Sequence, residues 1–126
     1  MLLADDHEKT LAKLRAILSK EFEVVGTASN GREAVAEVER LNPDVLVIDI
    51  SMPVLDGLQA ASQLRGKACG TKIIFLTVHE DQDYLDAAFA AGAYGYVTKS
   101  HLTTDLVPAI REAISGHKYV SKSIQQ

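Results

Sequence analysis

Three aspartates, a threonine and a lysine each stand at or just after the end of a short apolar run. Asp5 and Asp6 follow the first run, Asp49 and Thr77 follow two later ones, and Lys99 comes after the last. Taken singly, each has an ordinary explanation, since aspartates often end strands and cap helices. Three carboxylates brought together would repel one another, and a divalent cation would offset that repulsion. Because Mg²⁺ prefers carboxylate oxygens, the set predicts a Mg²⁺ site.

The lysine and the threonine would have roles beside such a cation. A lysine offers a compact positive charge to a phosphoryl group. The hydroxyl of a threonine can donate a hydrogen bond to a phosphoryl oxygen. Lys99 and Thr77 therefore extend the predicted cation site toward the chemistry of phosphate.

Short apolar runs alternate along the chain with longer stretches of helical periodicity. The runs predict strands at Met1–Ala4, Phe22–Thr27, Val45–Ile48, Lys72–Leu76 and Tyr94–Val97. We expect helices over Leu11–Leu18, from the cap residue Asn30 to Leu41, from Gly57 to Arg65, over Asp81–Ala91, and from the cap residue Thr104 to Gly116. On the last helix Val107, Ile110 and Ile114 should face inward, and Pro108 should lie near the end of the first turn.

This alternation predicts an α/β fold of the (βα)₅ type, a doubly wound parallel sheet covered by helices on both faces. In open sheets of this kind the ligand site lies beyond the carboxyl ends of the strands. The polar residues described above stand at that edge. The pattern therefore predicts that they converge.

The composition indicates one ordinary globular domain. The chain has 126 residues, 47% of them hydrophobic and 24% charged, and a net charge of −4. That balance argues against the basic surface of a nucleic-acid-binding protein. The single cysteine, Cys69, cannot form an internal disulfide, and no run is long enough to span a bilayer. No secretory leader precedes the first aspartates, so we expect a soluble cytoplasmic domain that contacts no membrane.

The order and spacing of these residues resemble the CheY-like receiver domain of bacterial two-component response regulators. The resemblance rests on Asp5-Asp6, Asp49, Met52-Pro53, Gly57, Thr77 and Lys99. The strings Leu3–His7 and Ala91–Lys99 are most similar to the NarL/FixJ (LuxR-type) subfamily. The resemblance covers residues 1–116, with 117–126 as a tail or the start of a linker. It implies a flavodoxin-like, CheY-like sheet with strand order 2-1-3-4-5.

The resemblance also implies specific roles at the predicted cation site. Asp49 would be the phosphoacceptor and would form an acyl phosphate. Asp6, Asp49 and the backbone carbonyl of Ser51 would bind Mg²⁺ directly, and Asp5 would act mainly through a bound water. Lys99 would pair first with Asp49 and then with the phosphoryl group.

Two further residues match the switch positions of that family. The Thr77 hydroxyl would move toward a phosphoryl oxygen, and the ring of Tyr96 would turn inward into the space vacated. Val78 follows Thr77 where a small residue is common, and Ser100 follows Lys99 where many receivers have proline. Neither departure removes a reactive group. The phosphodonor would be a phosphohistidine on a sensor histidine kinase, or a small phosphodonor.

Other interpretations fit the sequence less well. The segment 26–33 follows a strand and opens a helix as a P-loop does, but Arg32 and Glu33 replace its lysine and hydroxyl. A haloacid-dehalogenase-type phosphatase would need an aspartate at position 51, where this chain has Ser51. A flavodoxin-like cofactor binder would need a hydroxyl-rich and glycine-rich loop after the first strand. A Mg²⁺-dependent phosphatase acting in trans through an aspartyl phosphate remains the alternative function.

The resemblance also implies what the domain regulates. The residues after Gly116 resemble the stretch that leads to a helix-turn-helix domain, so we expect transcription to be regulated by a domain that this chain lacks. The chain alone should bind no nucleic acid, and it could form a homodimer on phosphorylation. His7, His79, His101 and His117 show no metal-ligand pairing. His79 and His101 could lie near the rim of the site and tune dephosphorylation, but exposed loop histidines are the preferred interpretation.

Overall fold

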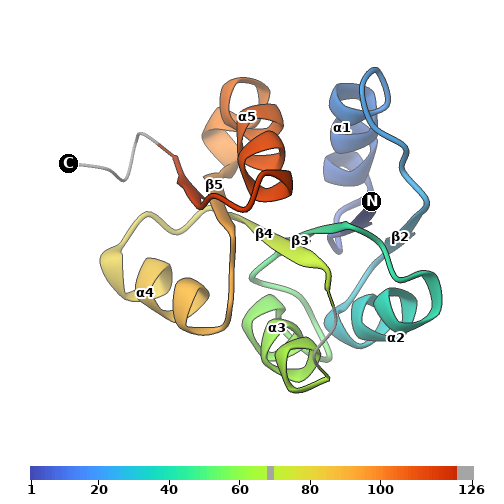
Figure 1. Cartoon of the computed structure of the whole chain (residues 1–126), viewed down its shortest axis with the longest axis vertical. Helices are drawn as coiled ribbons and strands as arrows, with labels where there is room; N and C mark the ends of the chain where they lie inside the picture. The colour runs from blue at the N-terminus through green and yellow to red at the C-terminus, as the bar shows by residue number, and fades with distance from the viewer. Residues whose placement is uncertain (68–69, 122–126) are drawn as a thin grey trace.

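Strands and helices alternate along the chain in the computed structural model, which describes residues 1–67 and 70–121 (Figure 1). The strands are β1 (Leu2–Ala4), β2 (Gly26–Ala28), β3 (Val45–Asp49), β4 (Lys72–Thr77), β5 (Gly95–Thr98) and β6 (Tyr119–Val120). The helices are α1 (Glu8–Leu18), α2 (Gly31–Leu41), α3 (Gly57–Gly66), α4 (Gln82–Ala90) and α5 (Leu102–Ile114), with a 3₁₀ turn, η1 (Lys99–His101), before α5. Cys69 lies outside the described residues.

The strands form one parallel sheet in the order β2-β1-β3-β4-β5-β6. The predicted order of the first five strands is confirmed. The sixth strand was not predicted. It pairs with β5, opposite Gly95 and Tyr96. We call the edge where the strands end the carboxyl edge, and the edge where they begin the amino edge.

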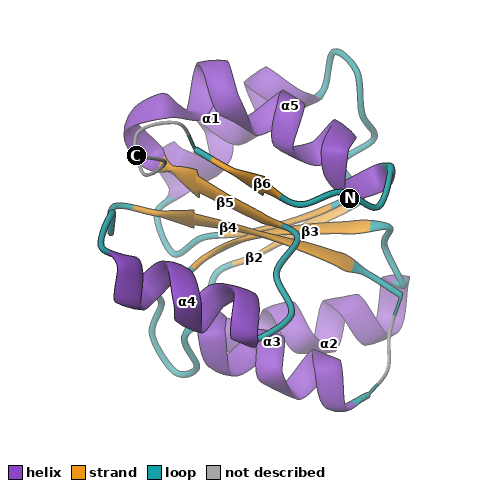
Figure 2. Cartoon of the chain, turned by 60° about the vertical axis from the view of Figure 1, so that its left-hand side comes forward, coloured by secondary structure: helices purple, strands orange, loops and turns teal. Residues whose placement is uncertain are grey.

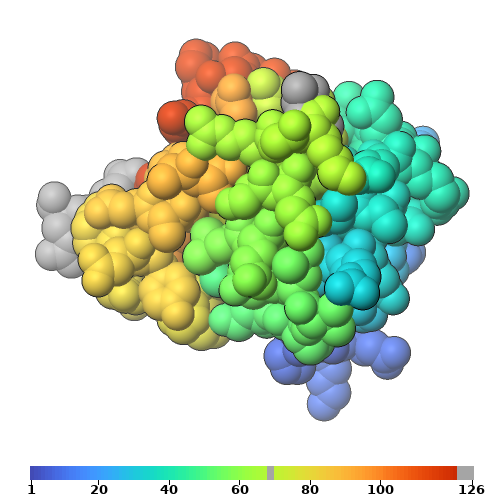
Figure 3. Space-filling view, turned by 90° about the horizontal axis from the view of Figure 1, so that it is seen from below, coloured from blue at the N-terminus to red at the C-terminus, as the bar shows by residue number. Residues whose placement is uncertain are grey.

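Helices cover both faces of the sheet, as Figure 2 shows: α1 and α5 lie on one face, and α2, α3 and α4 on the other. Figure 3 shows those last three helices side by side. Alternate strand residues point to opposite faces, so each face has its own core. Leu3, Val47 and Ile74 pack with α1 and α5, whereas Ile48 and Phe75 pack on the other face. Among the described residues, no helix is long and apolar enough to cross a membrane.

Three expectations for the last helix were wrong. The helix begins at Leu102, directly after η1, so Thr104 lies inside it and its hydroxyl donates to the His101 carbonyl. This earlier start places Pro108 in the helix interior, where its ring removes one backbone hydrogen bond. Pro108 faces solvent, so water can bond the carbonyl that loses its partner. Ile114 is 55% exposed instead of inward.

The second strand is also shorter than the sequence predicted, because pairing with β1 extends only over Gly26–Ala28. Residues 22–25 approach the sheet without joining its ladder, although Phe22 and Val24 pack against the α1–α5 core. The apolar character of Phe22 and Val24 therefore reflects packing against the core and not strand pairing, whereas Val25 is exposed.

Candidate functional site

The predicted carboxylates meet at the carboxyl edge of the sheet. Ala4 of β1 pairs with Ile48 of β3, so the next residues of the two strands, Asp5 and Asp49, emerge side by side. One ligand atom from each of Asp5, Asp6, His7 and Asp49 lies within 4.8 Å of the others. The convergence predicted from strand ends is therefore confirmed for these three aspartates.

Lys99 is placed between two of these carboxylates. Its Nζ lies 3.0 Å from Asp49 Oδ2 and 3.0 Å from Asp5 Oδ2. Burial raises the pKa of Asp49, and Lys99 only partly offsets that effect. Burial lowers the pKa of Lys99, but hydrogen bonds to Asp49 and Asp5 outweigh it and leave that pKa raised. The lysine is thus held charged beside carboxylates that outnumber it.

A test of the cation site is whether its oxygens already have partners. Asp5 is fully buried, and its Oδ2 has no well-directed hydrogen bond among the described residues, although Lys99 stands 3.0 Å away. Lys99 brings one positive charge to three carboxylates, so negative charge is left that a further cation would offset. Asp6 and Asp49 supply further oxygens beside Asp5. This donor set is hard and oxygen-rich, and it fits Mg²⁺.

His7 is a neighbour of this site that the sequence analysis did not place there. Its Nδ1 lies 3.3 Å from Asp5 Oδ1 and 3.2 Å from Asp6 Oδ1, while its side chain stays 67% exposed. Its backbone N–H also donates to Asp5 Oδ1. The expectation that His7 has no metal-ligand pairing was therefore wrong, because its ring lies with the three carboxylates. Its position directly after Asp5 and Asp6 was the available signal.

The loop after β3 fixes the orientation of Asp49. The Ser51 N–H donates to Asp49 Oδ1 at 3.2 Å, and the Gly57 N–H donates to the Ile50 carbonyl at 2.7 Å. A Cβ on Gly57 would stand 2.3 Å from the Asp49 carbonyl oxygen, so only glycine allows this approach. Val54 in the same loop has φ of 70°, which is strained for a β-branched residue. This loop keeps its shape at the expense of local strain.

Thr77 and Tyr96 are joined through the loop that follows β4. Thr77 Oγ1 accepts a hydrogen bond from His79 N at 2.9 Å, and the Tyr96 hydroxyl donates to His79 O at 2.9 Å. Tyr96 is fully buried, and burial raises its pKa to about 12. The ring of Tyr96 therefore points inward in this structure.

His79 itself links three elements, which sequence reasoning missed. Its ring stacks on Tyr84 of α4, with centroids 3.9 Å apart and planes 2° from parallel. Its Nε2 lies 3.3 Å from Ser51 Oγ in the loop after β3. A plain exposed loop histidine was the preferred interpretation, and it was wrong for this residue. No pattern in the sequence indicated the stack.

Comparisons with known proteins agree with this geometry. Residues 1–111 match the family model described as "Response regulator receiver domain". The chain is 39% identical over 128 residues to Response regulator UvrY of Escherichia coli K12, covering 100% of this chain and 59% of that protein. A two-component response regulator of the LuxR family from Aurantimonas sp. SI85-9A1 superposes with TM-score 0.92 at 30% identity, covering 98% of this chain and 89% of that one.

This chain belongs to the response regulator receiver family. It is a two-component signalling domain and not an enzyme in the usual sense. It is also similar to the isolated receiver of RcsB from Salmonella enterica serovar Typhimurium, determined in the presence of phosphomimetic BeF₃⁻, with TM-score 0.88 at 27% identity over 98% of this chain and 93% of that one. The cluster of Asp5, Asp6 and Asp49 is typical of a receiver's Mg²⁺ site. The chain spans about three fifths of the length of the curated regulators it matches.

A hollow beside the acidic cluster gives this receiver's site access to solvent. It has a volume of about 540 Å³, and Asp6, Ser51, Asp56 and Tyr84 are among its lining residues. Asp56 lines the hollow and also caps α3 through a reciprocal pair of hydrogen bonds with Gln59, which holds this part of the lining in place. A phosphodonor of modest size can thus approach the carboxylates from outside.

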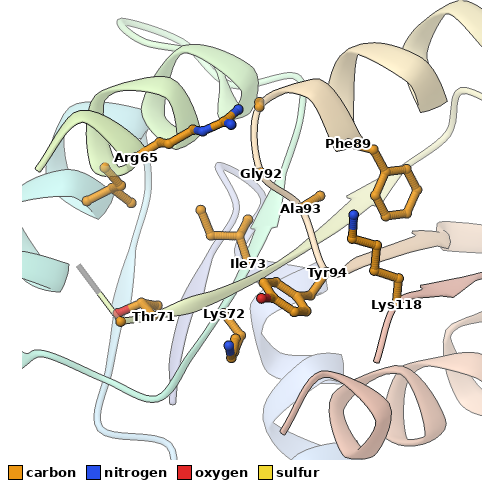
Figure 4. A pocket seen from close by; sticks show the side chains of 12 residues that line it. Arg65, Thr71, Lys72, Ile73, Phe89, Gly92, Ala93, Tyr94 and Lys118 are labelled. Atoms are coloured by element: carbon orange, nitrogen blue, oxygen red, sulfur yellow. The ribbon is translucent and has the colours of Figure 1, made fainter. Parts of the chain in front are cut away.

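A second pocket lies at the amino edge of the receiver, on the side of the sheet away from the carboxylates (Figure 4). Its volume is about 360 Å³, and it contains three cationic side chains. Arg65 donates to the Ala90 carbonyl at the end of α4, Lys72 lies over the Tyr94 ring, and Lys118 lies over the Phe89 ring. Each cation thus has a partner within the protein.

The segment that resembled a P-loop is a helix cap. The Asn30 side chain accepts a hydrogen bond from Glu33 N at 2.9 Å, and Glu33 accepts from both the N–H and the hydroxyl of Ser29. Gly31 is needed because a Cβ there would stand 2.0 Å from the Leu55 carbonyl oxygen. The Ser29 hydroxyl thus belongs to the cap of α2, and Gly31 joins that helix to the loop after β3, since its N–H donates to the Leu55 carbonyl.

Proposed function

We propose that this receiver accepts a phosphoryl group on Asp49 from a sensor histidine kinase and acts as a phosphorylation switch. The observation that carries the proposal is the state of the Asp49 carboxylate. One oxygen is held by Ser51 N–H at 3.2 Å and the other by Lys99 Nζ at 3.0 Å. A carboxylate fixed in this way, beside a cation site whose Asp6 and Ser51 line a solvent-filled hollow, is placed for nucleophilic attack.

The chemistry requires little besides position and charge neutralisation. An Asp49 oxygen attacks the phosphorus of a phosphohistidine, an O–P bond forms, and the P–N bond to the imidazole breaks. The imidazole nitrogen keeps the electron pair and takes up a proton. Lys99 faces the phosphoryl oxygens throughout. Hydrolysis of the acyl phosphate restores the Asp49 carboxylate.

Asp6, Asp49 and the Ser51 backbone carbonyl would hold Mg²⁺ directly, with Asp5 acting through a bound water. When bound, the ion would neutralise phosphoryl charge that Lys99 alone cannot offset. Asp6 suits direct contact because its side chain is exposed at the hollow. Asp5 suits the indirect role because it is fully buried and already faces Lys99.

Thr77 and Tyr96 would convert phosphorylation into a change of shape. The Thr77 oxygen accepts from His79 N–H, which leaves its own hydrogen to donate to a phosphoryl oxygen. Because the inward ring of Tyr96 donates to His79 O, next to Thr77, phosphorylation would increase the population of this arrangement. The affected surface would comprise α4, β5 and α5.

The longer relatives suggest what this switch controls. They are transcription regulators, so we infer that this receiver regulates transcription through a DNA-binding domain outside these 126 residues. Dimerisation on phosphorylation would then bring two such domains together. Sedimentation of the chain with and without beryllofluoride and Mg²⁺ tests this step, and a monomer under both conditions would contradict it.

The decisive experiment is phosphorylation with acetyl phosphate and Mg²⁺, followed by intact mass. We expect one added phosphoryl group on the wild type and none on Asp49→Asn. Asp44→Asn, at the amino edge, is the matched control and should be labelled like the wild type. Label that persists on Asp49→Asn would place the nucleophile elsewhere. Turnover of a free phosphomonoester without label would favour a phosphatase acting in trans.

A further inference from the structure

The segment that ends β6 reaches the turn on which Lys99 stands. Ser121 directly follows β6 and is fully buried. Its N–H donates to the Tyr96 carbonyl at 2.9 Å, and its Oγ accepts a hydrogen bond from Thr98 N at 3.1 Å. Thr98 is the last residue of β5 and immediately precedes Lys99. The serine therefore bonds the backbone of β5 at two successive points.

A buried carboxylate determines how the serine hydroxyl is oriented. Ser121 Oγ lies 2.8 Å from Asp105 Oδ2, and the Tyr119 hydroxyl lies 3.1 Å from Asp105 Oδ1. Asp105 belongs to the first turn of α5 and is only 7% exposed. A hydroxyl has one hydrogen to donate. Ser121 donates it to Asp105, so its lone pairs are directed at the Thr98 N–H.

The serine side chain takes the place of a backbone acceptor. In a parallel ladder the next donor of β5 would bond a carbonyl of its neighbour, but β6 ends at Val120. The Thr98 N–H is buried, and an unmet buried donor costs free energy. Without Ser121 we expect the Thr98–Lys99 turn to shift toward another partner. Lys99 Nζ is 3.0 Å from each of two carboxylates, so a small shift would separate them.

We propose that Ser121, oriented by Asp105, is a positioning residue for Lys99 and couples the phosphorylation site to β6. The inference rests on the proposed function, since it assigns a role to Lys99 in phosphorylation. Coupling between two sites is reciprocal. Occupation of the site by a phosphoryl group therefore alters the hydrogen bonds that hold β6, as removal of the Ser121 hydroxyl alters the reaction at Asp49.

The experiment measures two quantities on the same full chain: the rate of labelling by acetyl phosphate, and the affinity for Mg²⁺ alone. Ser121→Ala should slow labelling at least about fivefold, the lower end of typical coupling between sites. Its Mg²⁺ affinity should stay within about twofold of the wild type, because among the described residues the Ser121 hydroxyl bonds Asp105 and Thr98 and not Asp5, Asp6 or Asp49, the aspartates of the cation site. Tyr119→Phe removes a hydrogen bond to the same Asp105 but leaves Ser121 in place, and it should label at the wild-type rate.

A second arm uses the wild type and needs no variant to fold. Beryllofluoride with Mg²⁺ should change hydrogen exchange at the Thr98 and Ser121 amides at least about threefold. Labelling of Ser121→Ala at the wild-type rate, or exchange unaffected by beryllofluoride, would overturn the inference. So would equal losses of labelling rate and Mg²⁺ affinity, since those indicate general damage. A wild type that takes no label would refute the proposed function itself, and this inference with it.

Discussion

The two edges of the sheet hold their charges in opposite ways. At the carboxyl edge, three aspartates lie together and Lys99 pairs with two of them, Asp5 and Asp49, while a buried oxygen of Asp5 has no well-directed hydrogen bond among the described residues. At the amino edge, Arg65, Lys72 and Lys118 each meet a carbonyl oxygen or an aromatic ring. The first arrangement is incomplete without a ligand, whereas the second is complete by itself. Unbalanced buried charge thus distinguishes a functional edge from a structural one.

Substitution of the lysines should give the largest contrast between the edges. Lys99→Ala leaves Asp5 and Asp49 buried without their cation, and we expect a loss of about 3 kcal/mol in the free energy of unfolding at pH 7. Lys118→Ala removes one exposed cation–π contact and should cost about 0.5 kcal/mol. Urea unfolding of both variants measures the difference. Mg²⁺ should recover part of the loss in Lys99→Ala, and equal losses in the two variants would contradict the comparison.

Substitution of a glycine should likewise destabilise the protein more at the carboxyl edge than at the amino edge. A Cβ at Gly57 would meet the Asp49 carbonyl oxygen at 2.3 Å, so Gly57→Ala must displace the backbone of the site and should cost about 2–3 kcal/mol. Gly92 at the amino edge has φ of 98°, but a Cβ there would meet only the Arg65 side chain at an ordinary contact distance of 3.6 Å, so Gly92→Ala should cost about 1 kcal/mol. Only Gly57→Ala should also slow labelling by acetyl phosphate. Thermal unfolding and intact mass test both statements.

Val54→Gly should stabilise the protein, which is rare for a substitution to glycine. Val54 is 68% exposed and has φ of 70°, so the change loses little packing and removes strain in the loop after β3. The expected gain is about 1 kcal/mol in the free energy of unfolding. Val25→Gly, at another exposed valine, is the control and should destabilise or leave the protein unchanged. A loss of stability in Val54→Gly would show that the loop is not strained.

The pH dependence of stability should report the buried charge of Asp49, and this is the smallest expected effect. Burial raises the pKa of Asp49 above its usual 3.8. The folded state then binds this proton more tightly than the unfolded state does. The resulting stability is present below about pH 3.8 and is lost as the pH rises through the folded pKa. Asp49→Asn should therefore gain stability relative to the wild type over that rise, as urea unfolding at several pH values would show.

Sequence reasoning located the carboxyl edge well because its signals are local. Strand ends can be seen from where apolar runs stop, and parallel strands bring their ends together. That rule placed Asp5, Asp6 and Asp49 in one cluster and Lys99 beside it, as the structure confirms. The rule about strand ends could not predict the contacts of Thr77 and Tyr96 with the loop after β4, because that loop has no periodic pattern.

The features that the sequence did not reveal depend on distant partners. β6 has only two ladder residues, and its stability comes from Asp105 and Thr98, which lie more than ten residues away. The start of α5 was misplaced because Thr104 is a good cap residue. The helix instead begins at Leu102, because this residue packs into the core on the α1–α5 face of the sheet. In each case tertiary packing outweighed local preference.

The sixth strand has a practical consequence for protein engineering. One place to join this receiver to a new output module is just after its last helix, at Gly116. Such a junction would discard β6, expose the backbone donors and acceptors of β5, and leave a sheet edge open to aggregation. A chimera joined after Ser121 keeps β6 paired with β5 and so keeps the backbone of β5 covered. The choice of a few residues at the junction thus decides whether a hybrid sensor is soluble and responsive.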